Sequence, residues 1–284
     1  MIIKLKRKIF RIRYSKYLKV NDTINQKNLE FHYQNDLSQK RLFEYGFSIF
    51  SQHEEDGILL YIFSLIGTTN KKCIEMCIGN GVESNTANLI VNHFWTGLLF
   101  EGDPKNVEIA KMFYAFHKNT RIFPPKIQQD WIDKENVNSL IEENGFKGEI
   151  DLFSLDIDGM DYYLFEALEV ISARVVVLEI NHLWGYEKSL TVPYDKNFKA
   201  EFSVDGSDYA GASIKAFIKL AAKKGYRFVG TNRFATNAFF IRNDIRHAKL
   251  EEVTDLSIYF EHPRVQYGMN ERFKRIKNKE WVEV

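Results

Sequence analysis

The sequence predicts an α/β fold: a mostly parallel, seven-stranded sheet with helices on both faces and an antiparallel last strand. Residues 72–103 alternate strand, glycine turn, helix and strand, the pattern of a nucleotide site at the carboxyl edge of a parallel sheet. Residues 149–158 and 174–181 are two further apolar strands that end in polar groups, as parallel strands covered on both faces do. Two last strands, 226–230 and 237–242, are separated by a short turn, which indicates an antiparallel pair.

The length and composition of the chain indicate one large domain with additional segments. The 284 residues are 45% hydrophobic and 27% charged, so the chain can bury a core. A net charge of only +1 gives no general case for nucleic-acid binding. We find no signal peptide and no apolar run long enough to span a bilayer, and therefore predict a cytoplasmic protein. Cys73 and Cys77 are predicted to be buried, reduced thiols on the first strand.

Three regions are predicted along the chain. Residues 1–45 form an N-terminal arm, 46–250 the main domain, and 251–284 an extension packed on that domain. Residues 1–20 hold eight basic residues and no acid, interleaved with aliphatic and aromatic side chains. Such a segment packs on the body or on another subunit, as in a homo-oligomer, or lies on an anionic membrane; we favour packing.

The other elements follow from apolar periodicity and from glycine and proline positions. A strand is predicted at 121–129, and residues 183–210 form a long loop near the site. Helices are predicted at 58–67, 84–93, 104–118, 135–144, 162–171 and 211–224.

The glycine turn indicates which nucleotide the unit holds. A dinucleotide site needs a third glycine, where this chain has Ser84, and Glu75 would repel a pyrophosphate. The acid suits S-adenosylmethionine (SAM), which is cationic and has no phosphate. Glu75, Gly79 and Gly81 form an arrangement that resembles motif I of class I SAM methyltransferases, with Cys77 in the first glycine position. The alternative is an ordinary crossover whose glycines merely turn the chain.

A wider resemblance covers about residues 50–245. The chain is similar to the FkbM-type group of Rossmann-like class I methyltransferases in the segments SQHEEDGILLYIF, EMCIGNGVESNT, FEGD, SLDIDGMDY, LEIN, YAGAS and NAFFIRND. This resemblance implies a SAM-dependent O-methyltransferase acting on a hydroxyl of a sugar, nucleotide sugar or glycan, as in polysaccharide modification. The alternatives are a methyltransferase of a small non-sugar natural product, and a non-catalytic SAM- or nucleotide-binding module.

The resemblance also implies a set of cofactor residues. Glu101, at the end of the second strand, would accept hydrogen bonds from the ribose hydroxyls, and Asp130 would lie on the adenine side. The full set is Gln52, Glu75, Cys77, Gly79, Gly81, Asn85, Thr86, Glu101, Asp130 and Asp156.

Methyl transfer to a hydroxyl requires that its proton be removed or weakened, and two routes are open. Asp161 or His182 could act as a general base at the sheet edge. Alternatively, oxygen ligands at the ends of the fourth and fifth strands could hold Mg²⁺, which lowers a hydroxyl pKa. The candidate metal ligands are Asp158, Glu179 and Asn181, with Asp156 beside them.

Overall fold

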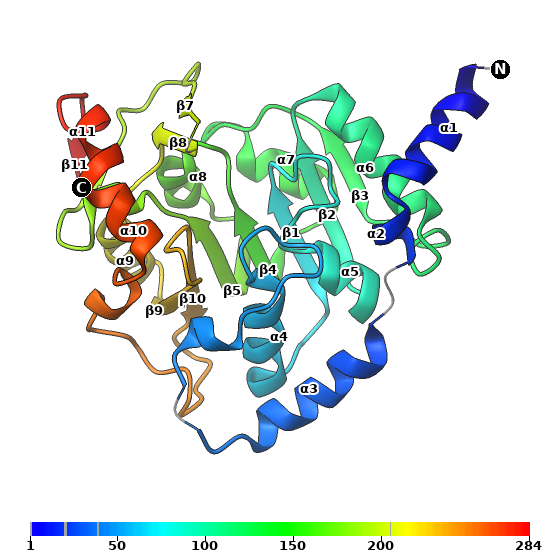
Figure 1. The fold of residues 1–284 in the computed structure, drawn as a ribbon, viewed down its shortest axis with the longest axis horizontal. Coiled ribbons are helices and arrows are strands. Elements are labelled where there is room, and N and C mark those ends of the chain that lie inside the picture. The colour runs from blue at the N-terminus through cyan, green and yellow to red at the C-terminus, as the bar shows by residue number, and fades with distance from the viewer. Residues whose placement is uncertain (1, 20–21, 39, 205) are drawn as a thin grey trace.

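A computed structural model describes residues 2–19, 22–38, 40–204 and 206–284. Its main feature is one seven-stranded sheet with the strand order β3-β2-β1-β4-β5-β10-β9 (Figure 1). Neighbouring strands are parallel except at β10, which is antiparallel to both β5 and β9. The predicted Rossmann-like fold, with its antiparallel last strand, is therefore confirmed.

The strands of the main sheet are β1 Lys72–Met76, β2 Thr96–Glu101, β3 Lys126–Gln129, β4 Gly148–Leu155, β5 Ile171–Glu179, β9 Tyr226–Thr231 and β10 Asn237–Arg242. Two small ribbons pair β6 Leu190–Thr191 with β11 Val282–Glu283 and β7 Glu201–Ser203 with β8 Gly206–Tyr209. The helices are α1 Ile2–Arg13, α2 Ser15–Lys19, α3 Thr23–Asn35, α4 Glu55–Ile66, α5 Ala87–His93, α6 Pro104–Phe116, α7 Val137–Glu143, α8 Asp161–Ala167, α9 Ile214–Lys223, α10 Pro263–Tyr267 and α11 Phe273–Ile276. Short helical turns are η1 Leu42–Tyr45, η2 His182–Trp184, η3 Ser257–Tyr259 and η4 Gly268–Arg272.

Helices cover both faces of the sheet. One hydrophobic cluster joins the sheet to α4, α5 and α6, and a second joins its other face to α7, α8 and α9. Helix α6 shows how local sequence sets an element: the Asp103 side chain accepts from the N–H of Lys105, and Pro104 occupies the first helical position.

Several predicted boundaries were wrong, for local reasons. The third strand starts at Lys126 because Pro124 and Pro125 have no N–H to give a strand ladder. The fourth strand ends at Leu155, before the acids assigned to it, and the fifth begins at Ile171. The predicted loop 183–210 contains η2 and the strands β6, β7 and β8.

The strand order fixes where a ligand can bind. The chain runs from β1 to β2 and β3 on one side, then crosses to β4 and β5 on the other. The carboxyl ends of β1 and β4 therefore flank the point where the direction of strand order reverses. In open α/β sheets, ligands bind in the crevice at this point.

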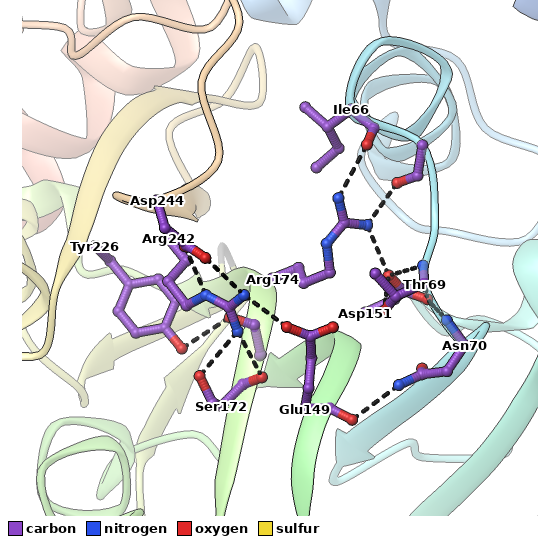
Figure 2. Close-up of polar contacts among 12 residues, drawn as sticks. Ile66, Thr69, Asn70, Glu149, Asp151, Ser172, Arg174, Tyr226, Arg242 and Asp244 are labelled. Atoms are coloured by element: carbon purple, nitrogen blue, oxygen red, sulfur yellow. Dashed lines mark hydrogen bonds and ion pairs between the residues drawn. The ribbon is translucent and has the colours of Figure 1, made fainter.

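The opposite, amino edge of the sheet is held by a buried ion pair (Figure 2). The Asp151 carboxylate is buried and accepts hydrogen bonds from the backbone N–H groups of residues 69–71. Arg174 donates to Asp151 at 2.8 Å and to the carbonyls of Ile66 and Gly67. The pair thus ties β4 and β5 to the turn that leads into β1.

Both ends of the chain pack on this core. At the N-terminal end, Phe10 is buried and its ring centroid lies 5.8 Å from that of Phe116. At the C-terminal end, Arg272 forms a buried ion pair with Asp208, with 2.7 Å between Nε and Oδ1. None of the helices in the described part of the chain is both long and apolar enough to cross a membrane.

Candidate functional site at the carboxyl edge of the sheet

The glycine turn after β1 combines one open position with one packed position. Gly79 has a φ of +53°, and no atom of the described residues lies within 4 Å of the place where a Cβ would be. Gly81 has a φ of +68°, and a Cβ there would lie 2.6 Å from the Cβ of Ala110 on α6. Gly81 is therefore required for packing, whereas Gly79 leaves room for a ligand to approach the backbone.

Cys77 lies in this turn, beyond the end of β1. Its φ of +62° is unusual for a residue other than glycine, and its side chain is exposed, whereas Cys73 is buried. The expectation of two buried thiols on the strand was thus wrong for Cys77.

The Glu75 carboxylate is hydrogen-bonded by neighbouring residues of the chain. Its buried carboxylate accepts hydrogen bonds from Ser84 Oγ and the N–H of Asn85, each at 2.9 Å. It also accepts from the N–H of Thr86 at 2.9 Å and from Thr86 Oγ1 at 2.5 Å. Burial raises the pKa of Glu75, although these four donors oppose the rise. Glu75, Asn85 and Thr86, predicted as cofactor residues, therefore bond to one another and fix the chain ahead of α5.

Glu101, at the end of β2, has a free acceptor. The side chain is buried, and its Oε1 accepts from the N–H of Asp103 at 2.8 Å. Its Oε2 is also buried but has no hydrogen-bond partner within the part of the chain that the structure describes. A buried, unpaired carboxylate oxygen is unfavourable by itself. This atom indicates a place where a ligand donates a hydrogen bond.

A flat apolar surface lies next to Glu101. Trp131 is 81% exposed, yet its ring lies about where a side chain on Gly102 would go, with ring atoms 2.8 Å from the Cβ position. The N–H of Asp130 donates to the carbonyl of Glu101, which holds this loop against β2. Asp130, predicted on the adenine side, and Trp131 are thus brought beside Glu101.

Three acids meet at the ends of β4 and β5 and form the acid cluster, Asp156, Asp158 and Glu179. One oxygen from each lies within 4.8 Å of the others. The two aspartates meet through a turn in which Asp158 has a φ of +55°, rather than through a strand as expected. Burial, with the nearby charges of Asp161 and Asp158, raises the pKa of Asp156 to about 8. Burial and the charge of Asp156 likewise raise the pKa of Glu179, so a cation would be stabilised here.

Asp161 lies beside the acid cluster and closes its turn. Its two oxygens accept from the N–H groups of Ile157 at 2.9 Å and Gly159 at 3.0 Å. Burial raises the pKa of Asp161 to about 6, against these two bonds, and the charge of Asp158 adds to the rise. The side chain is fully buried, so contact with an acceptor would require one of these two bonds to open.

His182 faces a different part of the molecule. Its Nε2 is buried and has no hydrogen-bond partner among the described residues. This atom lies 2.6 Å from the position that a Cβ on Gly268, in the C-terminal segment, would occupy. Burial, then the positive charges of Arg272 and Arg264, lower the pKa of His182 to about 3. The ring is therefore neutral, but the C-terminal segment covers it.

Asn181 is engaged in a structural role. Its amide donates to the carbonyls of Asp208 and Ala210 at 3.0 and 2.9 Å, and its oxygen accepts from the N–H of Leu183 at 3.0 Å. These bonds hold the segment after β8 against the end of β5. The third member of the acid cluster, beside Asp158 and Glu179, is therefore Asp156 and not the predicted Asn181.

Gln52 is exposed and lines a separate cavity of about 420 Å³. The other walls come from α2, through Lys16 and Tyr17, and from Glu83 in the glycine turn. The hydroxyl of Tyr17 donates to Glu83 Oε1 at 3.4 Å. Gln52 thus lies on the side of the glycine turn that faces the N-terminal arm.

Asn237 is a site residue that the sequence analysis missed. It pairs directly with Glu179 across β10 and β5, so the two side chains share a face of the sheet. Its Nδ2 donates to Oε1 of buried Glu55 at 2.9 Å. Its Oδ1 is buried and has no hydrogen-bond partner among the described residues. The segment NAFFIRND contained this residue, but only the strand register places it opposite Glu179.

Comparison with known proteins adds similarity of fold. No family model matches the chain and no curated protein matches it, so the FkbM assignment stays a prediction. One similar solved structure is the O-methyltransferase from Bacillus cereus in complex with SAH, at 13% identity, covering 60% of this chain and 72% of that chain, with a TM-score of 0.40. The CcbJ methyltransferase from Streptomyces caelestis has 10% identity, covering 68% and 90%, with a TM-score of 0.43.

A third is the N-terminal domain of EvdMO1 with SAH bound, at 14% identity, covering 76% of this chain and 94% of that chain, with a TM-score of 0.43. Similarity at this level says nothing about activity. The fold assignment rests on the strand order and directions described above.

Proposed function

We propose that this chain is a SAM-dependent methyltransferase that binds SAM at the carboxyl ends of β1 and β2. The observation that carries the proposal is the unpaired, buried Oε2 of Glu101. It lies at the end of the strand next to β1, whose following turn leaves open space at Gly79. A ribose diol supplies the donors that such an oxygen requires.

Two neighbouring features fit the two ends of the same ligand. The exposed ring of Trp131, seated on Gly102, provides a stacking surface on the adenine side of Glu101. The acid cluster provides negative charge for the cationic methionine end. When bound, SAM supplies a methyl group on a positively charged sulfur, ready for transfer to a nucleophile.

The chain's own residues would then prepare the acceptor hydroxyl. We assign the role of general base to Asp161, because it lies beside the acid cluster; its side chain is fully buried and both oxygens accept backbone N–H groups, so the acceptor hydroxyl would have to displace one of these donors. His182 is the weaker candidate, since Gly268 covers its Nε2. The alternative is that the acid cluster holds Mg²⁺, for which three carboxylates within 4.8 Å supply suitable oxygen ligands.

Parallel calorimetric titrations with SAM, S-adenosylhomocysteine and NAD test the binding proposal. We expect saturable binding of the first two and none of NAD, because Ser84 stands where a pyrophosphate site has its third glycine. Binding of NAD alone would contradict the proposal. Binding of SAM without transfer to any hydroxyl acceptor would support the non-catalytic alternative.

A chelator separates the two routes for the hydroxyl proton. With Asp161 as base, EDTA should leave the rate unchanged, and Asp161→Asn should lower it by roughly 10²–10⁴-fold while SAM affinity is retained. With a metal, EDTA should abolish activity, Mg²⁺ should restore it, and Asp158→Asn should remove the metal dependence. Full activity of Asp161→Asn in EDTA would exclude the metal and Asp161; full activity of His182→Ala as well would exclude a protein base among these residues.

The finer properties remain predictions. They are a sugar, nucleotide-sugar or glycan hydroxyl as acceptor, membership of the FkbM-type group, a cytoplasmic location and assembly into a homo-oligomer. A screen of hydroxyl acceptors for SAM-dependent methyl incorporation, with small non-sugar natural products as the second panel, distinguishes the two acceptor classes.

A further inference from the structure

Helix α1 has one side seated on the body and another side left uncovered. Phe10 is buried against Phe116 at the end of α6, and further along the arm Tyr17 packs on Phe50 with ring centroids 6.2 Å apart. Figure 1 shows α1 extending away from the body beside α6. Among the described side chains of α1, Phe10 is thus the one buried against the body.

The uncovered side carries exposed aliphatic residues at helical spacing. Ile9 and Ile12 are 56% and 68% exposed, and they lie three positions apart on the helix. Aliphatic residues repeated in this way form one stripe of an amphipathic helix, and such a stripe is normally covered by something.

The charge around this stripe indicates what covers it. Lys8 and Arg13 are exposed beside the two isoleucines, whereas the guanidinium of Arg11 lies over the Phe116 ring, 5.0 Å from its centroid. Residues 1–20 contain eight of the 39 basic residues of the chain and none of its 38 acids, so the rest of the chain is net acidic. We propose that this face of α1 docks on an anionic lipid bilayer, with Ile9 and Ile12 in the apolar region and the basic residues at the phosphates.

Other occupants fit the same face less well. A second copy of the chain would bring two acid-free basic helices together, and like charges at such a contact repel. Nucleic acid would satisfy the positive charge but would leave the aliphatic stripe exposed to water. A bilayer with anionic lipid headgroups accommodates both features.

The loop that follows α6 carries similar residues. Arg121 is exposed, and Ile122 and Phe123 beside it are 83% and 87% exposed. This loop begins just after Phe116, the residue on which Phe10 packs. We assign it as a second, smaller contact with the same membrane surface.

The test measures sedimentation of the full chain with vesicles of phosphatidylcholine alone, or of phosphatidylcholine and phosphatidylglycerol in equal parts. We expect the chain to bind the anionic vesicles and not the neutral ones, with binding that weakens as salt is added. The double variants Ile9→Asp/Ile12→Asp and Lys8→Glu/Arg13→Glu should each lose binding, by about fivefold or more per residue changed. Phe123→Asp should weaken it less.

A matched control is Phe31→Asp, which places an acid on an exposed aromatic of α3 and should bind like the wild type. Absence of wild-type binding to anionic vesicles overturns the proposal, and so does full binding by Ile9→Asp/Ile12→Asp. A dimer that this variant dissociates, without vesicle binding, would assign the face to a second copy. Binding to RNA without binding to vesicles would assign it to nucleic acid. None of these measurements involves SAM, so the result is independent of the proposed function.

Discussion

Replacing Glu101 with alanine should weaken SAM binding by about 1.5–3 kcal/mol, or roughly 10- to 150-fold. The variant removes a buried carboxylate whose Oε2 has no hydrogen-bond partner among the described residues. The hydrogen bond that is lost from this oxygen is therefore one made to the ligand. Its Oε1 bond to the N–H of Asp103 is lost as well, but that N–H lies at the sheet edge, where water can replace the carboxylate. Calorimetric titration of wild type and variant with SAM measures the effect.

The control for this experiment is Glu108→Ala, which removes an exposed acid from α6 and changes the net charge equally. It should leave SAM affinity unchanged. Thermal unfolding of both variants shows whether the fold is retained. A folded Glu101→Ala variant with wild-type affinity would contradict the ribose assignment.

Replacing Asp151 with alanine should lower the free energy of unfolding by about 3–5 kcal/mol. The change leaves the Arg174 guanidinium buried without its counter-ion, and it removes the acceptor for the N–H groups of residues 69–71 (Figure 2). Urea unfolding followed by circular dichroism measures the loss. Glu149→Ala is the comparison, because Glu149 pairs with Arg242 nearby but is partly exposed, and it should cost about 1 kcal/mol or less.

Two further measurements identify the ion pair as the cause. The double variant Asp151→Ala/Arg174→Met should be less destabilised than the sum of the two single variants, because it leaves no unpaired charge. Burial opposes ionisation of Asp151, but Arg174 and the backbone donors lower its pKa below the unfolded value of about 3.9. The contribution of Asp151 is therefore present above the unfolded pKa and is lost as pH falls through the folded one. Additive single effects and an unchanged acid dependence in Asp151→Ala would exclude this explanation.

The sequence by itself determined the fold class and the position of Glu101. Continuous apolar strands between helical segments predict a parallel sheet covered on both faces, because this pattern depends only on local side-chain periodicity. Glu101 could be found in the same way, since it follows the last apolar residue of its strand directly. The Gly79 turn was also recognisable, because glycine marks a backbone conformation that other residues rarely adopt.

The tertiary structure alone decided which polar side chains remain free for a ligand. Glu75 was predicted to face the cofactor, yet four donors between Ser84 and Thr86 saturate it. Asn237 joined the site through its register opposite Glu179, and His182 was covered by the C-terminal segment. The physical reason is the same in each case. Whether a buried polar atom is paired depends on neighbours that are distant in sequence or set by backbone geometry, and residue type and spacing do not specify them.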